Sequence, residues 1–253
     1  MDLGLKGLRA VITGGTKGIG RSTANLLAAE GCHVSVCARN KDEVAETISA
    51  LMKMGVTAYG EAIDVADKAA LAKFVTDSAK KLGGIDIVVA NVSALAVQDE
   101  EASWQKAFEV DMMHTVHAVN AAMPSLEKSK HGSVVTVSSV SGREIDFTGH
   151  AYGAFKAALV HYTQSMALKH AGQPIRFNSV SPGNTYFDGG VWQMIEKNLP
   201  DLFKTAMSMN PTGRMAKPDE IARGIVFLAS PASSFTTGTN LVIDGALTKG
   251  VQL

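Results

Sequence analysis

The sequence predicts an α/β protein with a doubly wound parallel sheet of about seven strands and helices on both faces. Short β-rich apolar runs alternate with longer helical patterns from one end of the chain to the other. The apolar runs contain few polar residues, as parallel strands do when helices cover both of their faces. No linker, repeat or low-complexity tract interrupts this alternation, so residues 1–253 are predicted to form a single domain.

The elements follow one another in strict β–α order. Strands are expected at Leu8–Thr13, His33–Cys37, Thr57–Ala62, Ile85–Ala90, Ser133–Ser138, Ile175–Val180 and Asn240–Ile243. Helices are expected at Gly18–Glu30, Lys41–Met54, Lys68–Leu82, Trp104–Lys128, Ala151–Ala171 and Pro218–Ala229. Because parallel strands need crossover connections, the intervening helices are expected to pack on the two faces of the sheet.

One segment, Gly183–Arg214, departs from the alternation. It is too long for a plain connection and contains Trp192, several methionines and two prolines. It follows a strand, so it lies at the carboxyl edge of the sheet, where doubly wound folds bind ligands. We expect a substrate-covering lid over about residues 184–214, with a helix at Val191–Asn198.

Composition narrows the possible partners and location. The formal net charge is zero, which argues against binding to nucleic acid or to anionic membranes. No apolar run reaches the length of a membrane span, and the amino terminus lacks a signal-peptide core, so a cytoplasmic location is expected. Cys32 and Cys37 flank a strand at an odd offset, which puts them on opposite faces and disfavours a disulfide or shared metal ion.

The first strand leads into a glycine-rich turn and a helix. Residues 13–20 read TGGTKGIG, and glycine lets the backbone approach a pyrophosphate at the helix N-terminus. A tight strand-to-helix turn without a ligand is the alternative, which the position after the first strand makes weaker. The candidate phosphate-binding residues are Gly14, Thr16, Lys17, Gly18, Ile19 and Gly20.

The end of the second strand is expected to select the cofactor. An acid there would bind the ribose 2′-hydroxyl of NAD, but the chain has Ala38, Arg39 and Asn40. Arg39, helped by Lys17, could bind a 2′-phosphate, so NADP(H) is predicted. After the third strand, Asp64 and Val65 could contact adenine, although Asp64 could equally form a turn or cap before the next helix.

Tyr152 and Lys156 lie four residues apart near the start of a predicted helix and therefore share one face. A nearby ammonium favours the phenolate form of a tyrosine, which makes Tyr152 a usable general acid. Ser138 and Ser139 end the preceding strand, and a hydroxyl there could hold a substrate oxygen. Taken alone, this tyrosine–lysine spacing is common and mostly structural.

These motifs together resemble the classical short-chain dehydrogenase/reductase family over the whole chain, in particular members like 3-oxoacyl-[acyl-carrier-protein] reductase. The resemblance implies a Rossmann fold and an oxidoreductase that moves a hydride between a nicotinamide and a carbonyl or secondary alcohol. It implies that Tyr152 exchanges the proton, Lys156 binds the nicotinamide ribose and Ser139 orients the carbonyl. Pro182 and Gly183 would pass the nicotinamide. Assembly into dimers or tetramers is also implied, with a homotetramer expected.

The chain departs from the family pattern at three places. The loop after the fourth strand keeps only Asn91, which could still contact the adenosine side. The family's catalytic asparagine falls on Asp111, which is nearly isosteric and could serve the same proton relay but adds a charge near the site. Both an intact and an altered relay stay open. Thr185 is expected to supply the carboxamide contact, because Phe187 stands at the usual threonine.

Asp111, His114 and His117 recur at three-residue spacing, which is compatible with a metal site or with a helix packed at a subunit contact. The subunit contact is favoured, and no metal is predicted.

Candidate substrate residues are mostly apolar or aromatic, which predicts a small, apolar or acyl-like substrate. They are Ser93, Leu95, Ser141, Ile145, Phe147, Tyr186, Trp192 and Met194. A basic group at Lys128, Lys130, His131 and Lys169 could receive an acidic carrier protein or simply be a solvated face. Two other functions stay open: an NAD-linked alcohol or sugar dehydrogenase, and a protein that senses the nucleotide without turnover.

Overall fold

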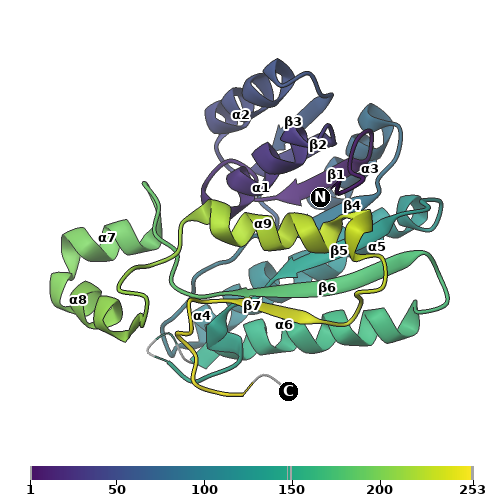
Figure 1. The fold of residues 1–253 in the computed structure, drawn as a ribbon. Coiled ribbons are helices and arrows are strands. Elements are labelled where there is room, and N and C mark those ends of the chain that lie inside the picture. Colours follow the sequence, from purple (N-terminus) through teal and green to yellow (C-terminus); the bar gives the residue numbers. More distant parts are fainter. Residues whose placement is uncertain (1, 147, 149, 252–253) are drawn as a thin grey trace.

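The computed structural model describes residues 2–146, 148 and 150–251 and contains one parallel sheet (Figure 1). Its strands are β1 (Arg9–Thr13), β2 (His33–Ala38), β3 (Ala58–Ala62), β4 (Ile87–Ala90), β5 (Gly132–Val137), β6 (Ile175–Pro182) and β7 (Asn240–Ile243). They are ordered β3-β2-β1-β4-β5-β6-β7, and every pair is parallel. The strand order reverses direction between β1 and β4, which confirms the predicted doubly wound sheet.

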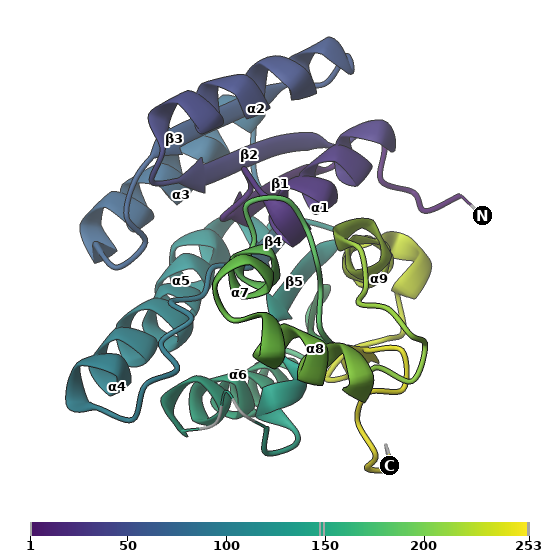
Figure 2. The same cartoon turned by 90° about the vertical axis from the view of Figure 1, so that its left-hand side faces the viewer.

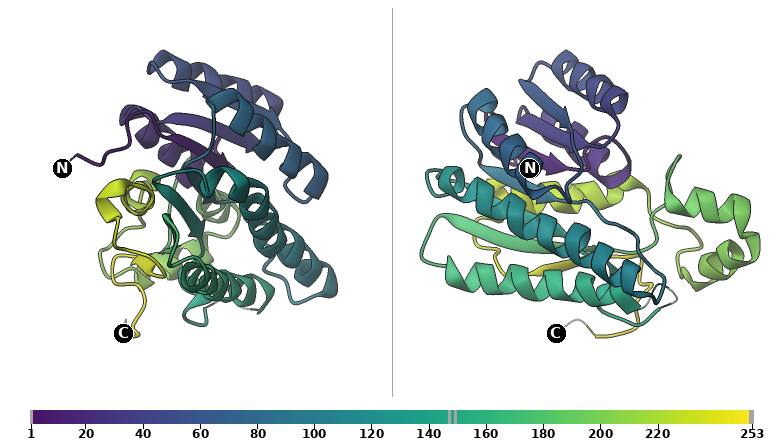
Figure 3. Two further views of the ribbon diagram at one scale, coloured as in Figure 1. Left: turned by 90° about the vertical axis from the view of Figure 1, so that its right-hand side faces the viewer. Right: turned by 180° about the vertical axis from the view of Figure 1, so that it is seen from behind.

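Helices cover both faces of the sheet, as expected from its apolar strands. They are α1 (Gly18–Ala29), α2 (Lys41–Lys53), α3 (Lys68–Leu82), α4 (Glu101–Ala107), α5 (His114–Leu126), α6 (His150–Lys169), α7 (Val191–Asn198), α8 (Pro200–Met209) and α9 (Pro218–Ala229). One apolar core lies under α1 and α9, and the other lies under α3, α5 and α6. The second face is the one seen from behind in Figure 3.

The predicted helix at Trp104–Lys128 is wrong in its detail, because the structure divides this stretch into three parts. Between α4 and α5 lies a π-helical turn, Phe108–Met113. Asp111 is fully buried in this turn. The wider turn follows contacts that Asp111 makes with other parts of the chain, and such contacts are invisible to a periodicity argument.

The lid contains two helices where one was predicted (Figure 2). The predicted helix is α7, and the additional helix α8 begins one residue after Leu199, with Pro200 in its first turn. Trp192 and Met215 are buried between them against Ala206 and Phe203, which gives the lid a small apolar core of its own. In Figure 1 both helices project beyond the carboxyl ends of the strands.

The two cysteines behave as the sequence predicts. Both are buried free thiols, with Cys32 in the core on one face of the sheet and Cys37 in the core on the other. Burial raises the pKa of the Cys37 thiol to about 12. Within the described part of the chain, no helix is long and apolar enough to cross a bilayer.

Candidate active site

A groove of about 460 Å³ runs along the carboxyl ends of β1, β2 and β4. Most of the predicted cofactor-binding residues of the adenosine side line it: Gly14, Thr16, Lys17, Arg39, Asn40, Asp64, Val65 and Asn91. Ser93, which was predicted to contact the substrate, lines the same groove. Gly18, Ile19 and Gly20 lie in the first turn of α1 beside it. The groove also takes in Glu43, Lys106 and Val110, which the sequence analysis did not select.

The glycine loop fits a pyrophosphate. A Cβ on Gly20 would lie 2.1 Å from the carbonyl oxygen of Gly14, so only glycine allows α1 to begin this close to β1. Lys17 precedes α1 without capping it through its side chain, which leaves the first-turn N–H groups available to an anion. The donor set at this turn therefore fits the predicted dinucleotide.

Two polar residues that line the groove, Asn40 and Asp64, also stabilise the local fold. The Asn40 side-chain oxygen accepts hydrogen bonds from the N–H groups of Asp42 (2.9 Å) and Glu43 (3.2 Å), so it caps α2. Asp64 accepts from the N–H of Ala66 at 3.0 Å, which makes it a turn residue facing the groove. The cap of α3 is Asp67 instead, which accepts from two first-turn N–H groups.

Asn91 fastens the glycine loop to the sheet. Its amide donates to the carbonyl oxygens of Thr13 and Gly14, each at 3.2 Å, and its own N–H donates to the Thr13 hydroxyl at 3.0 Å. Its side chain also lines the groove. The altered loop after β4 thus keeps the residue that shapes the phosphate turn.

Ser139, Tyr152 and Lys156 lie at the carboxyl end of β5 and the start of α6. The Lys156 ammonium is 2% exposed and donates to the carbonyl oxygen of Val137 at 3.0 Å. Ser138 donates to the carbonyl oxygen of Lys156 at 2.7 Å, which ties α6 to the strand. The Lys156 ammonium lies 5.7 Å from the centre of the Tyr152 ring. The structure therefore brings three of the four predicted catalytic residues to one edge of the sheet.

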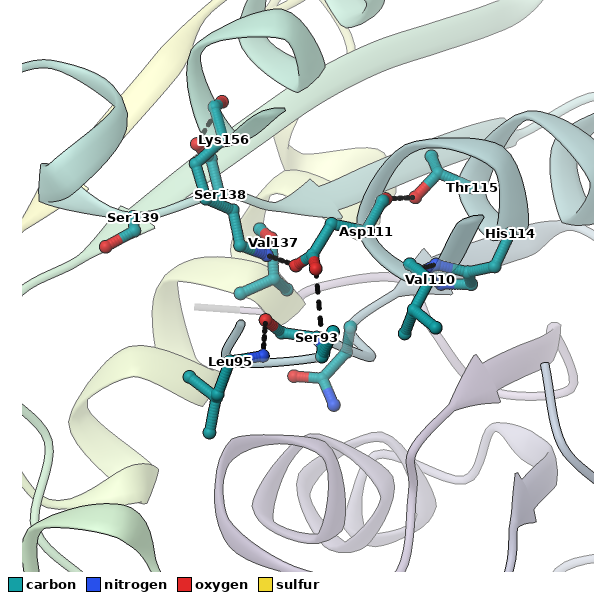
Figure 4. Close-up of polar contacts among 12 residues, drawn as sticks. Ser93, Leu95, Val110, Asp111, His114, Thr115, Val137, Ser138, Ser139 and Lys156 are labelled. Atoms are coloured by element: carbon teal, nitrogen blue, oxygen red, sulfur yellow. Dashed lines mark hydrogen bonds and ion pairs between the residues drawn. The ribbon is translucent and has the colours of Figure 1, made fainter. Parts of the chain in front are cut away.

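Asp111 forms a buried ion pair with Lys156 (Figure 4). The Asp111 Oδ1 atom lies 3.2 Å from the lysine Nζ, and Oδ2 accepts from the N–H of Ala94 at 3.1 Å. Both side chains are almost completely excluded from water, so each charge depends on the other. Figure 4 shows the carboxylate between the lysine and the loop that carries Ser93.

The buried His114 ring contacts polar groups of β1 and of the π-helical turn. Its Nε2 lies 3.2 Å from the Thr13 hydroxyl, and its Nδ1 contacts the carbonyl oxygen of Val110. Burial lowers the pKa of His114 to about 4. No group of three potential metal ligands gathers among the described residues, so the spacing of Asp111, His114 and His117 does not build a metal centre there.

The substrate side carries a polar network that the sequence analysis did not foresee. The Ser139 hydroxyl lies 3.2 Å from that of Ser141, which donates to Asp146 at 2.6 Å. Thr148 donates to the same carboxylate at 2.6 Å. Ser141, a predicted substrate residue, therefore lies next to Ser139.

The other predicted substrate residues have different positions. Ile145 is fully exposed, and Phe147 lies outside the described residues. Trp192 is 7% exposed and belongs to the lid core, while Tyr186 donates to Glu196 at the lid surface. These two aromatics build the lid. The exposed residues Lys128, Lys130, His131 and Lys169 lie toward the amino end of β5, opposite the edge with Tyr152, which fits a solvated face.

Phe187 lies where α1 begins. A Cβ on Gly18 would lie 2.5 Å from its ring, so the ring lies directly over the start of α1. Thr185 donates to the carbonyl oxygen of Gly183 at 3.0 Å and is buried. Pro182, Gly183 and Thr185 do not line the open groove, so their contact with the nicotinamide stays a prediction.

Comparison with known proteins gives the same picture over the full length. A family model described as enoyl-(acyl carrier protein) reductase matches residues 14–248. The chain is 38% identical to isoepoxydon dehydrogenase of Penicillium expansum, covering 100% of this chain and 99% of that protein.

Solved structures agree as well. L-sorbose reductase of Gluconobacter frateurii, complexed with NADPH and L-sorbose, is 27% identical with a TM-score of 0.91, over 99% of this chain and 100% of that one. A 7α-hydroxysteroid dehydrogenase complexed with NADH is 27% identical with a TM-score of 0.89, over 97% and 96% of the two chains.

A full-length match to such proteins, a doubly wound sheet and the gathered serine, tyrosine and lysine point to one conclusion. The chain is a nicotinamide-dependent oxidoreductase that belongs to the short-chain dehydrogenase/reductase family.

Proposed function

We propose that the protein transfers a hydride between NADP(H) and a small ketone or secondary alcohol. The observation that carries the proposal is that Lys156, on the helix of Tyr152, pairs with Asp111, whose carboxylate accepts from Ala94 in the lining of the groove. Lys17 and Arg39 line the same groove. Gly14, Thr16 and the first turn of α1 would hold the pyrophosphate. When bound, the nicotinamide supplies or accepts the hydride.

Within this proposal each catalytic side chain has a distinct task. Tyr152 exchanges a proton with the substrate oxygen, and Ser139 donates a hydrogen bond to it. Lys156 binds the nicotinamide ribose and holds positive charge near the phenol. Asp111 is a positioning residue, because its carboxylate pairs with the ammonium that also donates to the Val137 carbonyl.

NADP(H) is favoured because the end of β2 offers Ala38 and the exposed Arg39 where an acid would select NAD. Titration of the protein with NADPH and with NADH, followed by nicotinamide fluorescence, tests this choice. We expect tighter binding of NADPH. Tighter binding of NADH would instead support the NAD-linked dehydrogenase, for which the steroid dehydrogenase complexed with NADH is a precedent.

Two substrate classes compete. The apolar or acyl-like substrate expected from the sequence, such as a 3-oxoacyl thioester, agrees with the match to enoyl-(acyl carrier protein) reductase. The network of Ser141, Asp146 and Thr148 favours a second class, a ketone that bears hydroxyl groups. Measuring kcat/KM for acetoacetyl-coenzyme A, a cyclic hydroxyketone and a ketose, with both cofactors, separates them. No turnover of any member, with intact cofactor binding, would point to a nucleotide sensor.

A homo-oligomer is part of the same proposal, and the cytoplasmic location stays a prediction. Large apolar side chains are exposed on α4, the π-helical turn and α6: Trp104, Phe108 and Leu168. Phe235, after α9, is also fully exposed. Apolar side chains of this size often mark contacts between subunits. Sedimentation velocity at micromolar concentration should give a dimer or tetramer, and a monomer would contradict it.

A further inference from the structure

The cationic end of the groove already contains an anion of its own. Glu43, in the first turn of α2, places its Oε1 atom 2.8 Å from the Nζ of Lys17. Its other oxygen, Oε2, accepts from the hydroxyl of Thr16 at 3.2 Å. Both carboxylate oxygens are thus directed at the phosphate loop, and all three residues line the same groove.

The two cations that flank this end differ in their partners. The Lys17 ammonium is paired with Glu43, whereas Arg39 is exposed and has no hydrogen bond or ion pair with any other residue that the structure describes. A cofactor phosphate arriving here therefore meets one available cation and one that already has a counter-ion. A carboxylate beside a phosphate dianion also repels it.

The Lys17–Glu43 ion pair is exposed enough for a phosphate to replace Glu43 as the partner of Lys17. The side chain of Lys17 is 57% exposed and that of Glu43 is 27% exposed, so water screens their attraction. An ion pair of this kind is weak, and a phosphate with two negative charges can compete for the lysine. The Glu43 side chain is not part of the buried core, since the core contact of this turn of α2 is made by the neighbouring Val44.

We propose that Glu43 is a specificity-determining residue: its carboxylate is the internal counter-anion of Lys17 and so weakens the discrimination between a ribose 2′-phosphate and a 2′-hydroxyl. The inference rests on the proposed function only in placing the adenosine ribose at this end of the groove. It assigns to Glu43 a part of the ratio of the affinities for the two cofactors, whichever of them is preferred.

The test compares Glu43→Gln with the unchanged protein and with Glu46→Gln. Glu46 lies one turn further along α2, is exposed and does not line the groove, so it controls for a change of charge on the helix. The probes are 2′,5′-ADP and 5′-AMP, which differ in the 2′-phosphate and need no turnover, together with NADPH and NADH. Dissociation constants are measured by calorimetry at low and at high KCl.

Glu43→Gln should tighten binding of 2′,5′-ADP and NADPH about fivefold and change binding of 5′-AMP and NADH less than twofold. The gain should shrink in high KCl because the charges are partly exposed. Glu46→Gln should change neither class. Unchanged or weaker binding of 2′,5′-ADP by Glu43→Gln would overturn the inference, and so would an equal gain for all four probes.

A double variant shows whether the effect passes through Lys17. In a Lys17→Gln background, Glu43→Gln should tighten 2′,5′-ADP less than twofold. A full fivefold gain there would refute the role of counter-anion. The two proposals fail separately: a protein that prefers NADH yet gains affinity for 2′,5′-ADP in Glu43→Gln supports the inference and contradicts the NADP(H) assignment.

Discussion

The groove and the lid, two regions that meet at Phe187, are built in different ways. The groove is made from strand ends and helix starts, and its shape depends on main-chain groups such as those of Gly14 and Thr13, which Asn91 fastens together. The lid is made from α7 and α8, which hold each other through side chains around Trp192. Much of its apolar surface is exposed, including Met194 and Leu199.

This difference separates cofactor binding from substrate choice. A site formed by buried main chain is already shaped before its ligand arrives, and each strand end is fixed by its neighbours. A lid with a small core of its own can shift as a unit without disturbing the sheet. The following predictions ask whether the two regions respond separately, from the largest expected effect to the smallest.

Removing the phenol of Tyr152 should abolish most of the activity. Tyr152→Phe is expected to lower kcat by about 10²- to 10⁴-fold, because a positioned general acid contributes that much. The dissociation constant of NADPH should stay within twofold. Tyr162→Phe is the matched control: it lies on the same helix, and its buried hydroxyl has no hydrogen-bond partner among the residues that the structure describes. Nearly full activity of Tyr152→Phe would show that another group exchanges the proton with the substrate.

Removing the guanidinium of Arg39 should affect the groove alone. Arg39→Ala is expected to weaken NADPH about 10- to 100-fold, because hydrogen bonds to a charged group contribute about 1.5–3 kcal/mol. NADH binding and the KM of the ketone should change less than twofold. Arg223→Ala, on the exposed side of α9, controls for the loss of a surface arginine. A parallel loss for NADH would show that Arg39 does not distinguish the two cofactors.

Truncating Trp192 should affect the lid alone. A buried tryptophan replaced by alanine costs about 3–5 kcal/mol, here within the cluster of α7 and α8. Trp192→Ala should raise the KM of the ketone and speed limited proteolysis near residues 184–216. The midpoint of global thermal unfolding should move little if the lid opens by itself. An equally large drop of that midpoint and of NADPH affinity would mean that lid and groove unfold together.

Acid should lower the free energy of unfolding through protonation of His114. Its pKa in the folded protein is about 4, below the ordinary value of 6.5, so the unfolded chain takes up the proton first. Stability from the neutral imidazole is complete above about pH 6.5, falls as the pH drops toward 4, and totals about 3 kcal/mol. Urea unfolding of the unchanged protein and of His114→Gln from pH 7 to 4 measures it. Parallel slopes for the two proteins would contradict this assignment.

Sequence reasoning reached the sheet and the groove because their signals are local. Apolar runs predicted all seven observed strands, and the glycine spacing predicted where α1 begins. The lid was less predictable, because α8 starts at Pro200 and is held by contacts with distant residues. The ion pair of Asp111 with Lys156 and that of Glu43 with Lys17 each join residues far apart in the sequence. Sequence spacing cannot reveal such pairs. The presence of Glu43 four residues after Arg39 was the visible hint of an acid near the cations.

The π-helical turn makes the length of the chain at residues 108–113 a constraint in itself. A π turn holds about one residue more than an α turn, and one residue of helix corresponds to about 100° of rotation. Deleting a single residue there would turn α4 relative to α5 and carry Trp104 away from its edge contact with Phe155. Natural variants of this chain should therefore tolerate exchanges of the side chains within 108–113 other than Asp111, but carry no gaps or insertions, since a fixed number of residues keeps Asp111 facing the lysine.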